Sequence, residues 1–189
     1  MRSVILACAM AAALAACGQQ VEEKVEAPPI PEGPGYTLAL EQPAQLTLPE
    51  GSPISVTEGD VGLRLQGHLA SPSSQLQTDG ASFALGLQNE QAFSGQRVRV
   101  TFYARGIDGA TEFHSAYSTN GDGNSGWRRL RVTEVMDEVS YVFDVPAVRV
   151  ARDDFIGINP PAAGAVEVQW IRVSVEPAAP IESGGELRE

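Results

Sequence analysis

Apolar and polar residues alternate with a period of two over most of the chain between residues 36 and 176. Successive side chains of a β-strand point to opposite faces, so this period predicts strands with one buried face. Turn-rich segments separate the alternating stretches, and no amphipathic helical run of a dozen residues appears. The short, evenly spaced segments therefore predict an all-β sandwich or barrel. The alternation is clearest over residues 61–69, 83–87, 97–104, 139–145 and 166–175.

The last alternating segment changes phase within itself. Its apolar residues keep one phase up to Trp170 and the opposite phase from Ile171 onward. Such a change predicts either a β-bulge near these two residues or a strand that is buried on both faces. In both cases Trp170 is expected to be a buried residue.

The first residues of the chain follow a different pattern. The positive charge of Arg2 precedes an uncharged apolar run of about 11 residues, 4–14. A bilayer-spanning helix needs about 20 residues, so this run is too short to be one. A charged start, a short apolar run and small residues after it are typical of a secretory signal peptide.

The sequence that ends this run, Leu14-Ala15-Ala16-Cys17, resembles the lipobox of bacterial lipoproteins. The resemblance implies that residues 1–16 are a removed signal peptide and that Cys17 is lipidated. Two or more acyl chains hold a protein stably on a membrane, so the membrane is expected to be a partner through this lipid. Position 18 is Gly rather than Asp. By resemblance to the enterobacterial sorting rule, this implies the outer membrane, on its periplasmic face or the cell surface. The alternative is an ordinary signal peptide in which Cys17 occurs by chance.

Composition narrows the function classes and the domain plan. With 24 acidic and 13 basic residues the formal net charge is -11, which argues against nucleic acid as a partner. Both cysteines lie within the first 17 residues, so the remaining chain has no disulfide and must be held by its core. Two histidines without further cysteines exclude a Cys/His zinc site.

Segments rich in Pro, Glu and Gly predict a disordered linker over 17–35 and a disordered tail over 177–189, around one domain at 36–176.

Three stretches carry a second resemblance: 95–106, 126–132 followed by 141–145, and 156–160 followed by 164–173. In order and spacing they resemble the jelly-roll carbohydrate-binding modules of the galactose-binding-like β-sandwich group. The resemblance implies a jelly-roll β-sandwich that binds glycan without chemistry. It also implies an acidic residue near a structural calcium before the end of the last strand. Glu167 is the candidate there, and Gln169 would be a weak ligand.

Sugar binding needs an aromatic face and a few fixed polar groups. Tyr103, His114, Trp127 and Arg129 carry such groups, and they would line one outer face if their strands belong to one sheet. The competing interpretation makes Trp127 a core or rim residue and His114 an ordinary surface residue. Tyr103 is equally compatible with both interpretations.

Two polar segments have more ordinary explanations. The loop at 120–126 has oxygen-bearing side chains at alternate positions, as a calcium loop does, but Arg131 stands where its bidentate Glu belongs. We therefore expect a turn without a metal. Asp153 and Asp154 are expected to be solvated at the start of a strand.

No catalytic motif such as GxSxG, HExxH or a Walker-type loop occurs, so the protein is not expected to be an enzyme or to carry a cofactor. The leading hypothesis is a lipid-anchored domain that binds a polysaccharide by stacking and hydrogen bonds. The second is an envelope lipoprotein that docks onto a partner protein through a flat apolar patch or an open strand edge. The third is a hydrolase with a His or a carboxylate pair in a cleft.

Overall fold

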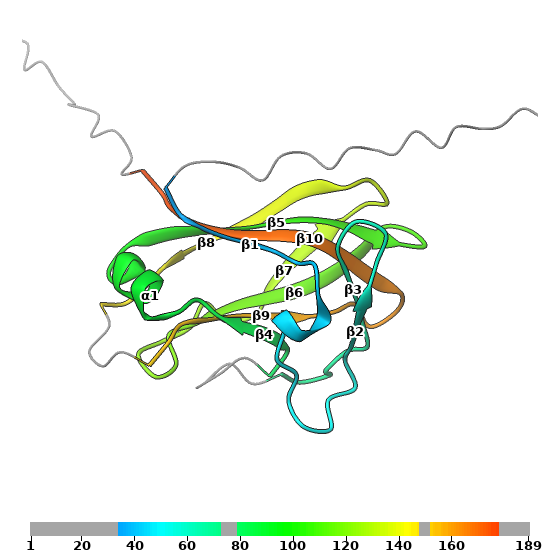
Figure 1. Cartoon of the computed structure of the whole chain (residues 1–189), viewed down its shortest axis with the longest axis horizontal. Coiled ribbons are helices and arrows are strands. Elements are labelled where there is room, and N and C mark those ends of the chain that lie inside the picture. Colours follow the sequence, from blue (N-terminus) through cyan, green and yellow to red (C-terminus); the bar gives the residue numbers. More distant parts are fainter. Residues whose placement is uncertain (1–33, 73–78, 148–151, 178–189) are drawn as a thin grey trace, which may run out of the picture.

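The computed structural model describes residues 34–72, 79–147 and 152–177. The predicted signal peptide, the lipidation residue Cys17 and nearly all of the predicted linker and tail lie outside these residues. Within them, ten strands form two antiparallel sheets, which face each other as the two layers of a sandwich (Figure 1). Helix α1 (Leu87–Phe93) and a 3-10 turn (Pro43–Gln45) lie beside the strands. None of the described helices is long and apolar enough to cross a membrane.

The larger sheet has the strand order β2-β3-β10-β5-β8, and β1 also pairs with β10. The smaller sheet has the order β4-β9-β6-β7. The strands of the larger sheet are β1 (Tyr36–Ala39), β2 (Ser55–Glu58), β3 (Leu63–Gln66), β5 (Arg97–Ile107), β8 (Asp137–Asp144) and β10 (Ala165–Val175). Those of the smaller sheet are β4 (Ala81–Ala84), β6 (Thr111–Ser118), β7 (Arg128–Val132) and β9 (Phe155–Asn159).

The strand pairs are nested along the chain. β3 pairs with β10, β4 with β9, β5 with β8, and β6 with β7, and every pair is antiparallel. The path is therefore that of one long hairpin wound over two sheets, with the connection between β6 and β7 at its tip. This arrangement is a jelly roll. The predicted fold class, an all-β jelly-roll β-sandwich, is confirmed.

The core lies between the sheets and follows the predicted alternation. On β5 the residues Val98, Val100 and Phe102 are fully buried, whereas Arg97 and Arg99 point the other way and keep contact with solvent. Phe102 meets Phe113 of the smaller sheet edge to face, with ring centroids 5.4 Å apart. Contacts of this kind join the two layers.

The predicted irregularity in the last strand is a β-bulge. The register between β10 and β5 shifts between Val168 and Trp170, which leaves Gln169 as the extra residue. On its other edge β10 changes partner at the same place, from β3 over Ala165–Val168 to β1 from Trp170 onward. Trp170 is 2% exposed, as predicted, but it lies outside the main core cluster.

Helix α1 is a departure from the predicted strand over residues 83–87. β4 ends at Ala84, and the chain turns through Gly86 with a φ of 80° before the helix begins at Leu87. Leu87 is 51% exposed rather than part of the predicted core face. The helix instead buries Glu90 and Phe93.

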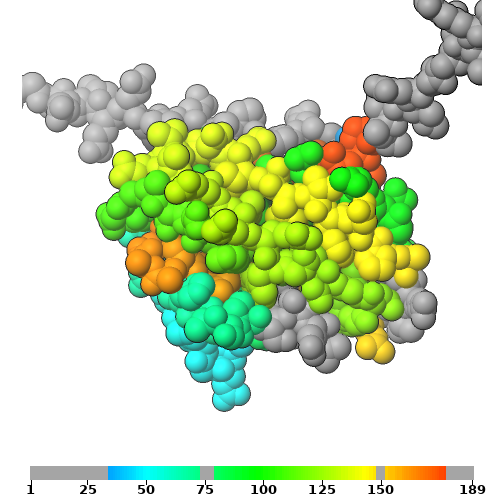
Figure 2. Space-filling model, turned by 180° about the vertical axis from the view of Figure 1, so that it is seen from behind, coloured from blue at the N-terminus to red at the C-terminus, as the bar shows by residue number. Residues whose placement is uncertain are grey.

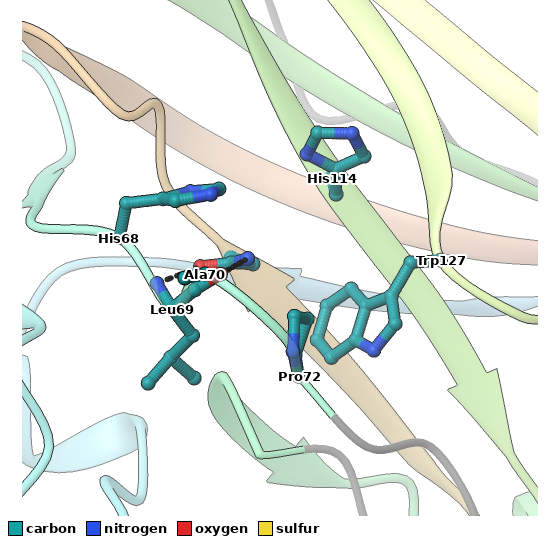
Figure 3. A pocket seen from close by; sticks show the side chains of 7 residues that line it. His68, Leu69, Ala70, Pro72, His114 and Trp127 are labelled. Atoms are coloured by element: carbon teal, nitrogen blue, oxygen red, sulfur yellow. Dashed lines mark hydrogen bonds between the residues drawn. The ribbon is translucent and has the colours of Figure 1, made fainter.

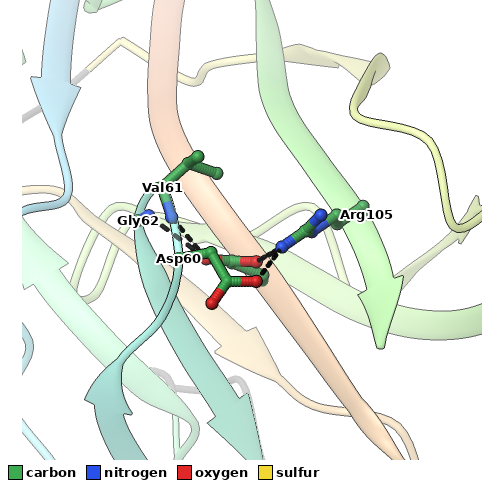
Figure 4. Close-up of polar contacts among 5 residues, drawn as sticks. Asp60, Val61, Gly62 and Arg105 are labelled. Carbon is green, nitrogen blue, oxygen red and sulfur yellow. Dashed lines mark hydrogen bonds and ion pairs between the residues drawn. The ribbon is translucent and has the colours of Figure 1, made fainter. Parts of the chain in front are cut away.

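A buried ion pair fixes the turn between β2 and β3 to the larger sheet (Figure 4). The Glu167 carboxylate of β10 has no solvent exposure, and it accepts hydrogen bonds from the backbone nitrogens of Val61 and Gly62. Arg105 of β5 donates to its other oxygen from Nε at 2.8 Å and from Nη2 at 2.6 Å. Asp60 accepts a further hydrogen bond from Arg105 at 2.6 Å.

Candidate functional site

A cavity of about 270 Å³ opens on the outer side of the smaller sheet. His114 of β6 and Asn159 of β9 are directly paired, and both alternate along their strands with core residues, so they face away from the core. The segment that follows β3 and the residue just before β7 complete the walls (Figure 3). The lining residues are His68, Leu69, Ala70, Pro72, His114, Trp127 and Asn159.

Asn159 fixes one wall of the cavity. Its side chain is 1% exposed, its Oδ1 accepts a hydrogen bond from the Leu69 nitrogen at 2.9 Å, and its Nδ2 donates to the Leu69 oxygen at 3.0 Å. Both halves of the amide are therefore satisfied by one residue of the neighbouring segment. His68 adds a third bond, from its Nδ1 to the Pro160 oxygen at 2.8 Å. The wall is thus tied to the end of β9 and is preformed.

The hydrogen bond of His68 determines its tautomer. A carbonyl oxygen only accepts, so the Nδ1 atom of His68 carries the hydrogen. In the neutral ring, Nε2 is then a hydrogen-bond acceptor. The two histidine rings lie 6.3 Å apart, centroid to centroid, on one cavity.

His114 is a neutral ring at neutral pH. Burial lowers its pKa below the ordinary value of 6.5, and the nearby His68 and Arg129 lower it further. Its Nδ1 is buried and has no hydrogen-bond partner among the described residues. A buried polar atom left unpaired costs about 1–3 kcal/mol, so this nitrogen lowers the stability of the folded state.

Trp127 forms the aromatic wall. Its side chain is half-buried and passes over Gly80, where an added Cβ atom would lie 3.0 Å from the indole Cη2 and 2.3 Å from the Ile158 oxygen. The indole ring can occupy this position because Gly80 has no side chain. In Figure 3 the ring lies beside Pro72, and with Leu69 it makes the apolar part of the lining.

Three of the four predicted ligand residues come together here. His114 and Trp127 both line the cavity, and Arg129 of β7 is paired directly with His114. Tyr103 does not join them, because β5 belongs to the larger sheet. Its ring stacks on Trp170, with centroids 5.4 Å apart and an interplanar angle of 8°. The expectation that all four residues line one face is therefore wrong for Tyr103.

His68 and Asn159 were not predicted as site residues. His68 follows the end of β3 as a polar position of the alternating segment 61–69, and Asn159 precedes two prolines that indicate a turn. The one available signal was that His68 is one of the chain's two histidines.

The expectation that Asp153 and Asp154 are solvated is wrong for Asp154, which has no solvent exposure and accepts a hydrogen bond from the Tyr117 hydroxyl. Glu90 of α1, 1% exposed, accepts a hydrogen bond from the Asp153 nitrogen at 3.0 Å. The segment before β9 is therefore held inside the domain by acidic side chains. The loop at 120–126 is a turn, as predicted, and the Thr119 nitrogen donates to the Gly123 oxygen across it at 2.9 Å.

The described residues contain no group of three or more His, Cys, Asp or Glu side chains placed to hold a metal ion. The residue that the family resemblance offered for calcium, Glu167, is already bonded to Arg105 and to two backbone nitrogens. A cation at this carboxylate would have to displace the Arg105 guanidinium. These contacts assign Glu167 a structural role.

No family model and no curated protein matches the chain. Among solved structures, it is similar to the CBM22-1 xylan-binding domain of Paenibacillus barcinonensis Xyn10C, with 13% identity, a TM-score of 0.49, and 79% of this chain and 100% of that chain covered. It is also similar to the C-terminal CBM6 of LamC, a marine laminarinase from Zobellia galactanivorans, at 15% identity, a TM-score of 0.43, and 74% and 99% coverage. A xylan-binding module CBM15 matches at 9% identity, a TM-score of 0.44, and 77% and 99% coverage. Likenesses at this level carry no argument about the ligand.

Proposed function

We propose that the cavity on the smaller sheet binds a carbohydrate. The observation that carries this proposal is the placement of a half-buried indole, Trp127, in one preformed cavity with His68 and His114. A sugar ring has an apolar C–H face that packs on an aromatic ring, and hydroxyls that both donate and accept hydrogen bonds. The acceptor Nε2 of His68 suits such hydroxyls.

The size of the cavity suits one sugar unit of a chain. Its volume of about 270 Å³ lies just below the range of about 300–1,000 Å³ for small-molecule sites. One ring would enter the cavity, and the flanking units would lie on the surface beside it.

The proposed activity is binding without chemistry. Glycoside hydrolysis ordinarily uses two carboxyl groups on either side of the scissile bond. The described residues that line the cavity include no carboxylate, hydroxyl or thiol. His68 is oriented by a backbone carbonyl rather than by an acidic side chain.

A glycan array probed with the purified full chain in detergent tests the proposal. Trp127→Ala is expected to abolish binding while the circular dichroism spectrum stays unchanged. Tyr103→Ala is the matched control, because it removes an aromatic ring from the other sheet. Its binding is expected to equal that of the wild type. Failure of the wild type to bind any glycan would contradict the proposal and favour docking onto a partner protein.

We also propose that the protein is a lipoprotein held at the outer membrane through Cys17. The support is the sequence Leu14-Ala15-Ala16-Cys17 at the end of a short apolar run, followed by Gly18. Cys17→Ser is expected to release the protein from the membrane fraction and to block removal of residues 1–16. A variant that stays in the membrane pellet and is still processed would contradict this proposal.

A further inference from the structure

The outer face of β7 carries two exposed arginines beside the cavity. Arg129 is paired with His114, and Arg131 is paired with Glu112, so both share the face that the cavity occupies. Their side chains are 70% and 79% exposed. Figure 2 shows the side of the molecule on which β7 and β8 reach the surface.

These arginines are neutralised less than Arg99 and Arg105 of the larger sheet. Arg99 bonds to Glu176 at 2.6 Å, and Arg105 approaches both Glu167 and Asp60 at 2.6 Å. Arg129 and Arg131, in contrast, share the single carboxylate of Glu112 at 3.6 and 3.7 Å. Exposed ion pairs at such distances are weak, so both guanidinium groups are open to a stronger acceptor.

The positive charge on this face stands against the charge of the whole chain. A formal net charge of -11 repels an anionic polymer at long range. Beside the cavity, the two weakly paired arginines instead attract an anionic group. Guanidinium groups bind carboxylates through two parallel hydrogen bonds. Arg129 and Arg131 lie about 6.6 Å apart along the strand, from a rise of about 3.3 Å per residue. They thus form a short track that leads away from the cavity.

We propose that the ligand is an acidic polysaccharide, in which one sugar ring enters the cavity and the carboxylates of uronic acid units beside it bind Arg129 and Arg131. This inference rests on the proposed carbohydrate-binding function and adds the class of sugar. The arginines lie outside the cavity and favour ligands with charged sugar units, whereas Trp127 contributes the stacking surface inside it.

Titration calorimetry of the full chain in detergent tests the inference with three polymers: polygalacturonate, the same polymer with its carboxyls reduced to alcohols, and dextran sulfate. The wild type is expected to bind polygalacturonate at least about tenfold more tightly than the reduced polymer, as charge-assisted hydrogen bonds predict. R129Q/R131Q is expected to lose this difference, and added salt is expected to diminish it. Arg97→Gln, an exposed arginine of the larger sheet, is the control and should keep it.

Each failure has its own meaning. Equal affinity for the charged and the reduced polymer, or a preference that survives in a folded R129Q/R131Q variant, would overturn the acidic-sugar inference and leave the Trp127 site intact. Equal affinity for dextran sulfate and polygalacturonate would overturn the assignment to carboxylates. No binding to any of the three polymers or to any arrayed glycan would contradict the proposed function itself.

Discussion

Tyr117 donates its phenolic hydrogen to the carboxylate of Asp154, and neither side chain is exposed to solvent. The pKa of Asp154 is raised from 3.8 to about 6, first by burial. The Tyr117 hydrogen bond opposes this rise, and the acidic groups of Glu90, Asp153 and Asp122 add to it. The pKa of Tyr117 is raised as well, first by burial. This pair connects the stability of the domain to pH.

Asp154 is expected to make the folded state less stable as the pH rises from about 4 to about 6. A raised folded-state pKa means that the native protein holds a proton that the unfolded chain has released, so the contribution is complete below pH 3.8 and is lost through about pH 6. The shift corresponds to about 3 kcal/mol of unfolding free energy. Urea unfolding gives the unfolding free energies of the wild type and of Asp154→Asn at pH 4 and pH 7. The difference between the two proteins is expected to change by this amount between the two pH values. Asp144→Asn, at an exposed carboxyl, should show a change below about 0.5 kcal/mol.

Arg105 is expected to matter far more for stability than Arg97, although both extend from β5. Arg105→Ala leaves the fully buried carboxylate of Glu167 without its cation, which costs about 3–5 kcal/mol. Arg97→Ala removes an exposed pair with Asp144 at 3.5 Å, worth less than about 1 kcal/mol. Denaturant midpoints of the two variants provide the comparison. Equal losses would show that the Glu167 contacts do not hold the turn between β2 and β3.

Asn159→Asp is expected to lower both stability and glycan affinity. The aspartate lacks the Nδ2 donor and brings an oxygen against the Leu69 carbonyl, at a cost of about 1–3 kcal/mol. The cavity wall then loses its attachment to β9. Asn89→Asp is the matched control, since its amide also donates to a backbone oxygen, that of Leu85 at 2.6 Å, but does not line the cavity. Asn89→Asp should lose stability but keep its glycan affinity. An equal loss of affinity in both variants would mean that the Asn159 amide has no specific part in holding the cavity wall.

His114 is expected to stay neutral at pH 7 and to titrate below 6.5. Because its folded pKa is lowered by burial and by the charges of His68 and Arg129, its contribution to stability is present above pH 6.5 and is lost as the pH falls through the folded pKa. Long-range ¹H–¹⁵N spectra over this pH range report the titration, and His114→Gln assigns the signal. The same spectra should show a hydrogen on Nδ1 of His68. A His114 titration above 6.5 would contradict its burial.

The sequence predicted the strands of the core because alternation is a local property. The segment at 97–104 became part of β5, and the phase change before Ile171 became the bulge at Gln169. The sheet to which each strand belongs depends on distant pairings. Tyr103 was therefore grouped with His114 and Trp127, although the jelly-roll path places β5 in the other layer.

Contacts between distant segments could not be predicted either. His68 meets Pro160 across 92 residues of sequence, and no local pattern indicates such a contact. Asp154 was expected in solvent because carboxylates are rarely buried. Its burial depends on Tyr117, a partner on β6 that lies 37 residues earlier in the sequence.

The pairing of β10 with β1 at one end and with β3 at the other makes the two ends of the domain different. Tyr36, at the start of the first strand, lies opposite Val173, so the described chain begins and ends at the same end of the sandwich (Figure 1). His68 lies just beyond Gln66, which pairs with Ala165 at the other end of β10. A strand of 11 residues is about 36 Å long, at about 3.3 Å per residue. A fusion joined to the chain directly before Tyr36 or directly after Val175 would therefore lie at the end of the sandwich opposite to His68 of the cavity wall.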